Sequence, residues 1–339
     1  MSLLGKSWQR IIIIDLLYLG DLMFATPFIK ELRKNFPKAR IDLIVNSAFH
    51  SIMEDNTKLD NVYSYDKEWT LKQSIEFAKL ISKNNYDLGI NIHGSWRSAI
   101  LLRLINPTYI IGYGKKGQLF LNRRLTQPQN QHMVDIYLNL LREMDLRVES
   151  SLPYLEIKKS VQDEIDKKLI SWGINPKEKL IALNTGGTWP TKRWTAKGFA
   201  QLGDILNRKY GRVILIGSLG DLPLVEGIVN LMETKPVIVT GKTNLRELAA
   251  LLARCDLVIS NDSGPVHVAA AVGTPTITIF GPSDDLKYRP LGEKHKIVKA
   301  PIDCRPCGKH QCPLNHHHCM TEIKVDAIID EIEKSRLLK

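Results

Sequence analysis

The sequence lacks long hydrophobic runs. No stretch of its 339 residues approaches the roughly 18 apolar residues that a membrane-spanning helix needs. The apolar run Ile11–Ile14 ends at Asp15, which makes it too short for the core of a signal peptide, and no small-residue cleavage site accompanies it. These absences argue against an integral membrane protein and predict residence in the cytoplasm.

Two common nucleotide-binding signatures are also missing. No G-x-G-x-x-G follows the first predicted strand, where Leu19-Gly20-Asp21 stands instead, and this counts against a nicotinamide-dependent oxidoreductase. The G-x-x-x-x-G-K-[ST] spacing of a P-loop is absent as well. No internal repeat or low-complexity tract appears. A chain of this length with 44% apolar residues is expected to form two globular domains.

Acidic residues are absent from the interval between Asp87 and Asp135. Two interpretations of its basic side chains stay open: a solvated basic face, or a site for an anionic acceptor, since arginine presents a fork suited to carboxylate or phosphate. We favour the second. The acceptor-site candidates, with the glycine after the first strand included, are Gly20, His93, Arg97, Lys115, Lys116, Arg123, Arg124 and His132.

The net charge of +11 indicates an acidic partner or a membrane surface. Because this charge is spread over both halves of the chain, we do not expect a basic arm that binds nucleic acid. An acidic glycolipid at the inner face of the cytoplasmic membrane suits the charge, and peripheral contact with that face is the matching expectation.

The stretch Leu257–Gly281 predicts a strand, a polar turn, a helix and a second strand, which is a βαβ unit of a parallel sheet. The helix is expected to start at Pro265 and to stop at Gly273. At its N-terminus, Gly264 lets an anion approach unpaired N–H groups, so a phosphate-bearing ligand is one interpretation. The other is an ordinary crossover helix with Ser263 as its N-cap.

A second possible phosphate cradle follows the predicted strand Leu180–Asn184. The turn Thr185–Thr188 offers hydroxyls and flexible backbone N–H groups, and Lys192 and Arg193 offer positive charge. Further along, Asp221 follows another strand and is either a ligand for ribose hydroxyls or a helix cap.

The first domain alternates strands and helices, which predicts a doubly wound sheet. Its first strand, Arg10–Asp15, is rich in isoleucine, as in buried parallel sheets. Asp21 lies at the following junction. It is either a helix residue favoured by the helix dipole or a base at the mouth of the sheet.

In combination, four motifs resemble glycosyltransferase family 9, whose best-known members are heptosyltransferases of the lipopolysaccharide inner core. The motifs are Leu19-Gly20-Asp21, Thr185-Gly186-Gly187 with Lys192-Arg193-Trp194, Asn261-Asp262-Ser263-Gly264-Pro265 with His267, and Phe280-Gly281-Pro282-Ser283-Asp284. The resemblance extends from about residue 10 to residue 330. The resemblance implies the GT-B architecture, in which two Rossmann-like domains face each other across a cleft.

This resemblance also implies the domain roles and the reaction. Residues 1–155 would bind the glycolipid acceptor, residues 156–324 would bind the ADP-heptose donor, and residues 325–339 would form a helix that packs back on the N-terminal domain. Transfer would invert the anomeric centre with no obligatory metal or cofactor. The carboxylate at Asp21 would be the general base.

Chemistry assigns matching roles to the residues. Displacement at an anomeric carbon needs a base for the acceptor hydroxyl and fixed donors for the departing diphosphate. We therefore predict Asp21 and Lys192 as catalytic residues. Asp262 is expected on sugar hydroxyls, and His267 is either a donor contact or a core histidine. The full predicted donor-binding set is Thr185, Gly186, Gly187, Thr188, Lys192, Arg193, Asp221, Asp262, Ser263, Gly264 and His267.

Four cysteines cluster near the end of the chain, Cys304, Cys307, Cys312 and Cys319. Such spacings can bind zinc, but the gaps are irregular for a structural site. We therefore expect reduced thiols or a disulfide pair there, with a bound metal as the alternative. Two rival functions also stay open: a nicotinamide-dependent oxidoreductase, and a non-catalytic binder of anionic glycolipid.

Overall fold

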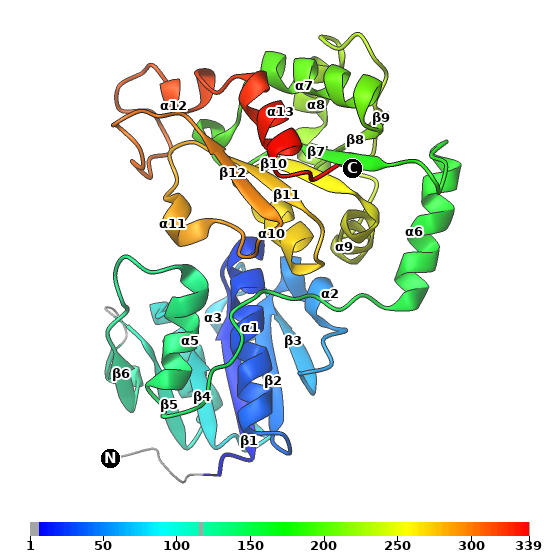
Figure 1. The fold of residues 1–339 in the computed structure, drawn as a ribbon. Coiled ribbons are helices and arrows are strands. Elements are labelled where there is room, and N and C mark those ends of the chain that lie inside the picture. The colour runs from blue at the N-terminus through cyan, green and yellow to red at the C-terminus, as the bar shows by residue number, and fades with distance from the viewer. Residues whose placement is uncertain (1–6, 115–117, 339) are drawn as a thin grey trace. The chain divides into compact units, whose positions relative to one another are not determined.

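The computed structural model describes residues 7–114 and 118–338 and divides into two compact units, Met1–Glu156 and Ile157–Lys339 (Figure 1). Each unit is built on a six-stranded sheet whose strands all run parallel. Within the described residues, no helix is both long and apolar enough to cross a bilayer.

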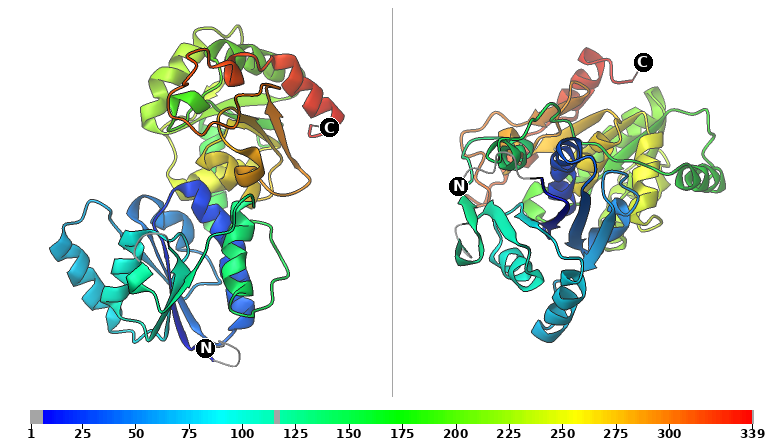
Figure 2. Two further views of the ribbon diagram at one scale, coloured as in Figure 1. Left: turned by 90° about the vertical axis from the view of Figure 1, so that its left-hand side faces the viewer. Right: turned by 90° about the horizontal axis from the view of Figure 1, so that it is seen from below.

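The sheet of the first unit has the order β3-β2-β1-β4-β5-β6. Its strands are β1 (Arg10–Asp15), β2 (Arg40–Asn46), β3 (Asn61–Tyr65), β4 (Leu88–Asn91), β5 (Tyr109–Tyr113) and β6 (Arg123–Leu125). The α-helices are α1 (Leu19–Asn35), α2 (His50–Met53), α3 (Leu71–Ser82), α4 (Trp96–Ile105) and α5 (Met133–Arg142). Helices α1 and α5 pack together on one face of the sheet, and α3 and α4 pack together on the other (Figure 2).

The sheet of the second unit has the order β12-β11-β10-β7-β8-β9. Its strands are β7 (Leu180–Asn184), β8 (Arg212–Ile216), β9 (Val237–Ile238), β10 (Leu257–Asn261), β11 (Thr276–Phe280) and β12 (His295–Lys299). The α-helices are α6 (Lys159–Ser171), α7 (Ala196–Lys209), α8 (Leu222–Val229), α9 (Leu245–Arg254), α10 (Gly264–Ala271), α11 (Asp285–Tyr288), α12 (His318–Thr321) and α13 (Val325–Lys334).

The two sheets share one topology. In each, the first strand of the unit lies beside the fourth, and the strand order reverses between them. These reversal points are β1/β4 in the first unit and β7/β10 in the second. Ligands of open α/β sheets bind outside the carboxyl ends of strands at such a point. The predicted doubly wound α/β class is therefore confirmed, and the topology selects one edge of each sheet for function.

The sequence predicts this helix over Phe28–Asn35, after Pro27, but α1 begins at Leu19 and Pro27 lies inside it. A proline in a helix removes an N–H and leaves the carbonyl four residues before it without its usual donor. Here that carbonyl belongs to Met23, and it accepts a 2.7 Å hydrogen bond from the Thr26 hydroxyl. The helix therefore continues through Pro27, and Asp21 lies in its first turn.

Two other expectations differ from the structure. The sequence of Tyr154–Ile157, in the connection between the domains, predicts a strand, but this segment pairs with neither sheet. Helix α13 was expected on the N-terminal domain, but Ile328 and Ile332 are buried in the core of the second unit, where α13 contacts α7 and β12. The second sheet has an apolar face of its own, and the amphipathic helix α13 covers part of it.

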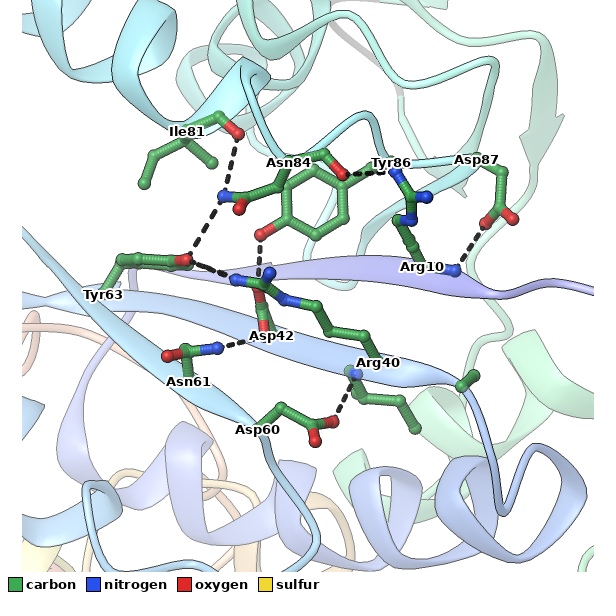
Figure 3. Close-up of polar contacts among 12 residues, drawn as sticks. Arg10, Arg40, Asp42, Asp60, Asn61, Tyr63, Ile81, Asn84, Tyr86 and Asp87 are labelled. Atoms are coloured by element: carbon green, nitrogen blue, oxygen red, sulfur yellow. Dashed lines mark hydrogen bonds and ion pairs between the residues drawn. The ribbon is translucent and has the colours of Figure 1, made fainter.

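The first unit contains a buried charge at the amino-terminal side of its sheet. Asp42 of β2 is fully buried and accepts hydrogen bonds from Arg40 Nε (2.9 Å), Asn61 Nδ2 (3.1 Å) and the Tyr86 hydroxyl (Figure 3). Burial and this contact raise the pKa of Tyr86, so its proton stays on the phenol. Asp42 lies near the amino ends of the strands, whereas ligands of such sheets bind at the carboxyl ends. We therefore interpret the cluster as structural.

Replacing this buried carboxylate should destabilise the first unit. We expect Asp42→Ala to lower the free energy of unfolding by about 3 kcal/mol, because Arg40 and Tyr86 lose a shared buried partner. The matched control Glu76→Ala removes an exposed acid from α3 of the same unit and should change stability by less than about 0.5 kcal/mol. Urea unfolding followed by tryptophan fluorescence measures both, and equal midpoints for the two variants would contradict a structural role.

Candidate functional site

A buried hydrogen bond bridges the reversal point of the first sheet. Asp15 is the last residue of β1, and His93 lies in the loop after β4. His93 Nε2 lies 2.7 Å from Asp15 Oδ1, and both side chains are almost fully buried. The amide of Leu17 also donates to Asp15 Oδ1 (3.2 Å), which fixes the carboxylate at the start of the loop that leads to α1.

Two further residues extend this bridge towards solvent. The hydroxyl of Tyr137, a fully buried residue of α5, lies 2.8 Å from His93 Nδ1 and 3.5 Å from Asp21 Oδ1. Asp21 is only half-buried. Its position in the first turn of α1 stabilises the carboxylate form through the helix dipole. The predicted base thus lies at the carboxyl edge of the sheet, in contact with a buried polar chain.

The acceptor-site candidates do not form one group. Arg97 is exposed in the first turn of α4 and donates to the Lys67 carbonyl (3.0 Å), close to that edge of the sheet. Gly20 lies beside Asp21 in the first turn of α1. Arg124 is exposed on the edge strand β6. Lys115 and Lys116 lie outside the described residues.

Two of these candidates have structural partners instead. His132 is buried at the N-cap of α5, where its Nδ1 accepts a hydrogen bond from the Val134 amide (3.1 Å). His132 thus caps the helix that carries Tyr137. We therefore no longer assign His132 to the acceptor site. Arg123 of β6 forms an ion pair with Glu143 (3.3 Å) just beyond α5, which occupies its guanidinium.

Asparagines hold together the reversal point of the second sheet. Asn184, at the end of β7, donates from Nδ2 to the hydroxyls of Ser260 (2.9 Å) and Ser263 (2.7 Å). Asn261, at the end of β10, donates to the carbonyls of Thr185 (2.8 Å) and Gly186 (3.0 Å). These bonds fix the Thr185–Thr188 turn beside the N-terminus of α10, so the two predicted phosphate cradles form one site.

The N-terminus of α10 is available to an anion. The helix begins at Gly264, and its first amides have no acceptor within the helix. Ser263 occupies the N-cap position, but its side chain makes no cap hydrogen bond in the described part of the chain. Its hydroxyl instead accepts from Asn184, so the alternative of an ordinary serine-capped helix does not describe this turn.

Lys192 and Asp262 form an ion pair at this site, with Lys192 Nζ 2.7 Å from Asp262 Oδ2. Lys192 also lies over the ring of Trp189, 4.7 Å from its centroid. Asp262 is buried, with His267 Nε2 3.7 Å from its other oxygen. Burial raises the pKa of Asp262, but His267 and Lys192 outweigh it and lower the pKa to about 2. Asp262 is therefore ionised at neutral pH and orients a half-buried cation.

The low pKa of Asp262 predicts a pH-dependent contribution to stability. Because the folded state lowers the pKa from 3.8 to about 2, the contribution is complete above pH 4 and is lost as pH falls from about 4 to 2. We expect Asp262→Asn to be less stable than wild type by about 2 kcal/mol at pH 7, and by about half of that at pH 3. Exposed Asp326→Asn in α13 is the control. A gap between Asp262→Asn and wild type that does not shrink in acid would contradict this.

The remaining candidates in the donor-site turn differ in exposure and in hydrogen bonding. Thr188 is exposed, whereas Arg193 donates from Nε to the Gly187 carbonyl (2.8 Å) and so closes the turn. Thr185 is buried, and its hydroxyl has no hydrogen-bond partner among the described residues. An unsatisfied buried hydroxyl at the end of β7 is what a ligand-binding position would show.

Asp221 caps a helix. Its carboxylate accepts hydrogen bonds from the Ser218 amide (2.9 Å) and the Ser218 hydroxyl (2.6 Å). A Cβ added to Gly186 would meet this carboxylate, so Gly186 is needed for the close approach of the β7 turn. The cap interpretation describes these contacts, and we do not propose a ribose contact for Asp221.

Three of the C-terminal cysteines lie in the loop between β12 and α12, and the fourth, Cys319, lies in α12. Cys304, Cys307, Cys312 and Cys319, with His316 and His317, line one pocket. They and Cys255 are free thiols. Backbone amides, that of His317 foremost, lower the pKa of Cys312, whereas burial raises the pKa of Cys319 to about 11. Over residues 7–114 and 118–338, no group of three or more metal-binding side chains is arranged to hold an ion.

Sequence reasoning missed the residues that hold each site together. Asp15, Tyr137 and Asn184 were not among the candidates, although the first and the last end the strands at the two reversal points. A polar residue that ends a buried strand was the available signal. Tyr137 gave none, because only the packing of α5 on α1 brings it to His93.

Comparison with known proteins adds to this geometry. Residues 75–318 match the family described as Glycosyltransferase family 9 (heptosyltransferase). Lipopolysaccharide core heptosyltransferase OpsX of Haemophilus influenzae is 27% identical over 98% of this chain and 99% of its own length. A glycosyl transferase family 9 structure from Veillonella parvula superposes with a TM-score of 0.89 at 28% identity, covering 99% of both chains.

A solved structure of E. coli ADP-heptose lps heptosyltransferase II has the same fold, with a TM-score of 0.83 at 21% identity over 97% of this chain and 99% of that one. The predicted architecture of two Rossmann-like units is therefore confirmed. The family match also decides against the two rival functions, an oxidoreductase and a non-catalytic binder.

Proposed function

This chain belongs to glycosyltransferase family 9 and is a glycosyltransferase, and from this premise we propose that it transfers heptose from ADP-heptose to a hydroxyl of the lipopolysaccharide inner core. The observation that carries the proposal is the pair of sites at equivalent positions of the two sheets. A carboxylate lies at the first reversal point, and a lysine beside a helix N-terminus lies at the second. An inverting displacement uses these two groups.

The donor site is proposed in the second unit. The diphosphate of ADP-heptose would lie against the amides of Ser263 and Gly264, with the hydroxyls of Thr185 and Thr188 and the Lys192 ammonium as further donors. Charge develops on this diphosphate as the anomeric bond breaks, so donors that are fixed in advance stabilise the transition state more than the bound substrate. Asp262 fixes Lys192 for this purpose, and His267 supports Asp262.

The acceptor site is proposed in the first unit. Asp21 would take the proton of the acceptor hydroxyl while the hydroxyl oxygen attacks the anomeric carbon from the face opposite to ADP. The C–O bond to ADP then breaks, and the configuration at this carbon inverts. Arg97, exposed near the same edge, is our candidate for a phosphate of the acceptor. The net charge of +11 suits an anionic glycolipid and contact with the membrane face that carries it.

A panel of donors tests this function directly. The purified protein would be incubated with ADP-heptose, ADP-glucose, UDP-glucose or GDP-mannose, and with lipopolysaccharide truncated in its inner core. We expect product, detected by mass spectrometry of the acceptor, with ADP-heptose alone. Transfer from a uridine or guanosine donor, or none from ADP-heptose to any truncated core, would contradict the proposal.

A further inference from the structure

The donors and acceptors of the buried chain behind Asp21 limit where its protons can lie. Asp15, as a carboxylate, only accepts hydrogen bonds, so His93 Nε2 must carry a proton and donate it across the 2.7 Å contact. The state of Nδ1 then sets the direction of the Tyr137 hydroxyl, which lies 2.8 Å away. A hydroxyl has one proton and can donate it to one neighbour at a time.

Two states of the chain follow. When His93 is neutral, Nδ1 is an acceptor, and the Tyr137 hydroxyl donates to it. When His93 is an imidazolium, Nδ1–H donates to the Tyr137 oxygen, and the hydroxyl proton points to Asp21 Oδ1 at 3.5 Å. The position of the Tyr137 proton thus couples the protonation of buried His93 to half-buried Asp21.

From this geometry we propose that Tyr137, His93 and Asp15 form a proton relay that accepts the proton taken by Asp21 during sugar transfer. The relay rests on the proposed role of Asp21 as base. Asp21 removes the proton from the acceptor hydroxyl and passes it to the Tyr137 oxygen as the phenol proton moves to His93 Nδ1. The resulting imidazolium is paired with the Asp15 carboxylate. No oxidant or reductant is needed, and the proton remains in the first unit until it returns to solvent.

Burial supports a relay over a mere positioning contact. Asp15, His93 and Tyr137 have side chains that are almost fully buried, and an ion pair formed there is little screened by water. Asp15 Oδ2 has no hydrogen-bond partner within the described residues, which leaves this carboxylate under-stabilised until a cation forms beside it. Lys67, in the β3–α3 connection, is a charged group that faces this cluster, since it interacts electrostatically with both Asp15 and Asp21, and Arg97 of α4 in turn lies near Lys67.

The test compares two buried tyrosines. Tyr137→Phe removes the relay hydroxyl and keeps the ring. Tyr113→Phe is the matched control, because the Tyr113 hydroxyl is also buried and donates to a backbone carbonyl of α5, that of Ile136 (2.6 Å). We expect kcat for transfer from ADP-heptose to truncated lipopolysaccharide to fall about tenfold or more in Tyr137→Phe. In both variants KM for ADP-heptose should stay within about twofold of wild type, as the donor site lies in the other unit.

The solvent isotope effect separates the relay from a structural role. In wild type the relay moves two further protons, one from Asp21 to the Tyr137 oxygen and one from the Tyr137 hydroxyl to His93 Nδ1, so kcat should be lower in D2O than in H2O. Tyr137→Phe should show a smaller difference between the two solvents, because Asp21 then has no connection to His93. Asp15→Asn is the second variant: kcat should fall at unchanged KM for ADP-heptose, because the imidazolium formed by the relay loses its paired carboxylate.

The outcomes distinguish the relay from the underlying function. A solvent isotope effect that is unchanged in Tyr137→Phe, with Tyr137→Phe as active as Tyr113→Phe, would overturn the relay. If Asp21→Ala is as active as wild type, the role of Asp21 as base fails instead. Loss of transfer from ADP-heptose in the wild-type protein would reject the proposed function itself.

Discussion

Replacing Asp21 by alanine should lower heptose transfer by about a thousandfold and leave the affinity for ADP-heptose unchanged. The magnitude is that of losing a general base held within reach of the attacking hydroxyl. Donor affinity should survive because every group that we assign to the diphosphate belongs to the second unit. Turnover is measured by ADP release with truncated lipopolysaccharide, and donor affinity by calorimetry.

Asp135→Ala is the matched control for this change. Asp135 is also an acid in the first turn of a helix of the first unit, but it lies on α5 and faces Arg142 at 3.8 Å. The Asp135→Ala variant should keep turnover within about twofold of wild type, as expected for the loss of an exposed charge. Asp21→Asn, which keeps the size and loses the basicity, should be as inactive as Asp21→Ala. Substantial turnover in Asp21→Asn would remove this residue from the chemistry.

Lys192→Met should lower kcat/KM for ADP-heptose by about a hundredfold. Lys192 is the one charged donor that we place on the departing diphosphate, and deleting a fixed donor of this kind typically costs about a hundredfold to a thousandfold in rate. The loss should appear more in kcat than in the affinity for ADP, since negative charge on the diphosphate is greatest in the transition state. Initial rates over a range of ADP-heptose concentrations separate the two parameters.

The fold must be checked in the same experiment, because Lys192→Met also removes the closest cation from buried Asp262. Lys192→Arg keeps the charge and should restore part of the rate while restoring stability. Lys197→Met, an exposed lysine of α7, should have neither effect. If Lys192→Met lost stability but kept kcat/KM, the residue would be a partner of Asp262 and nothing more.

The sequence predicted the strands best where the chain is buried on both faces. The isoleucine-rich run predicted both ends of β1 correctly. In the stretch from β10 to β11, the start of the helix was predicted to within one residue. The start of α1 was missed, because Pro27 reads as a helix boundary unless the Thr26 hydroxyl is known to cover the Met23 carbonyl. Strands β5 and β6 were not predicted, because β5 contains a glycine and β6 is a three-residue strand with two arginines.

Candidate site residues could be predicted only where a single local sequence motif indicates their chemistry. Asp21 and Lys192 lie in recognisable turns, and the structure places both at a reversal point of the strand order. The partners of such residues are set by packing. Asp15 and His93 are 78 positions apart in the chain, and only the adjacency of β1 and β4 joins them. His132 shows the converse, because it was predicted to bind the acceptor and instead caps α5. For Asp221 the sequence left a ribose ligand and a helix cap open, and the contacts are those of the cap.

The central claim is that the diphosphate is held by the second unit, whereas the base belongs to the first. A crystal structure with a non-transferable ADP-heptose analogue tests it most directly. We expect the diphosphate oxygens within hydrogen-bond distance of Lys192 Nζ and of the amides of Ser263 and Gly264. A diphosphate bound in the first unit, for instance at Arg97, with the second reversal point unoccupied, would contradict the account.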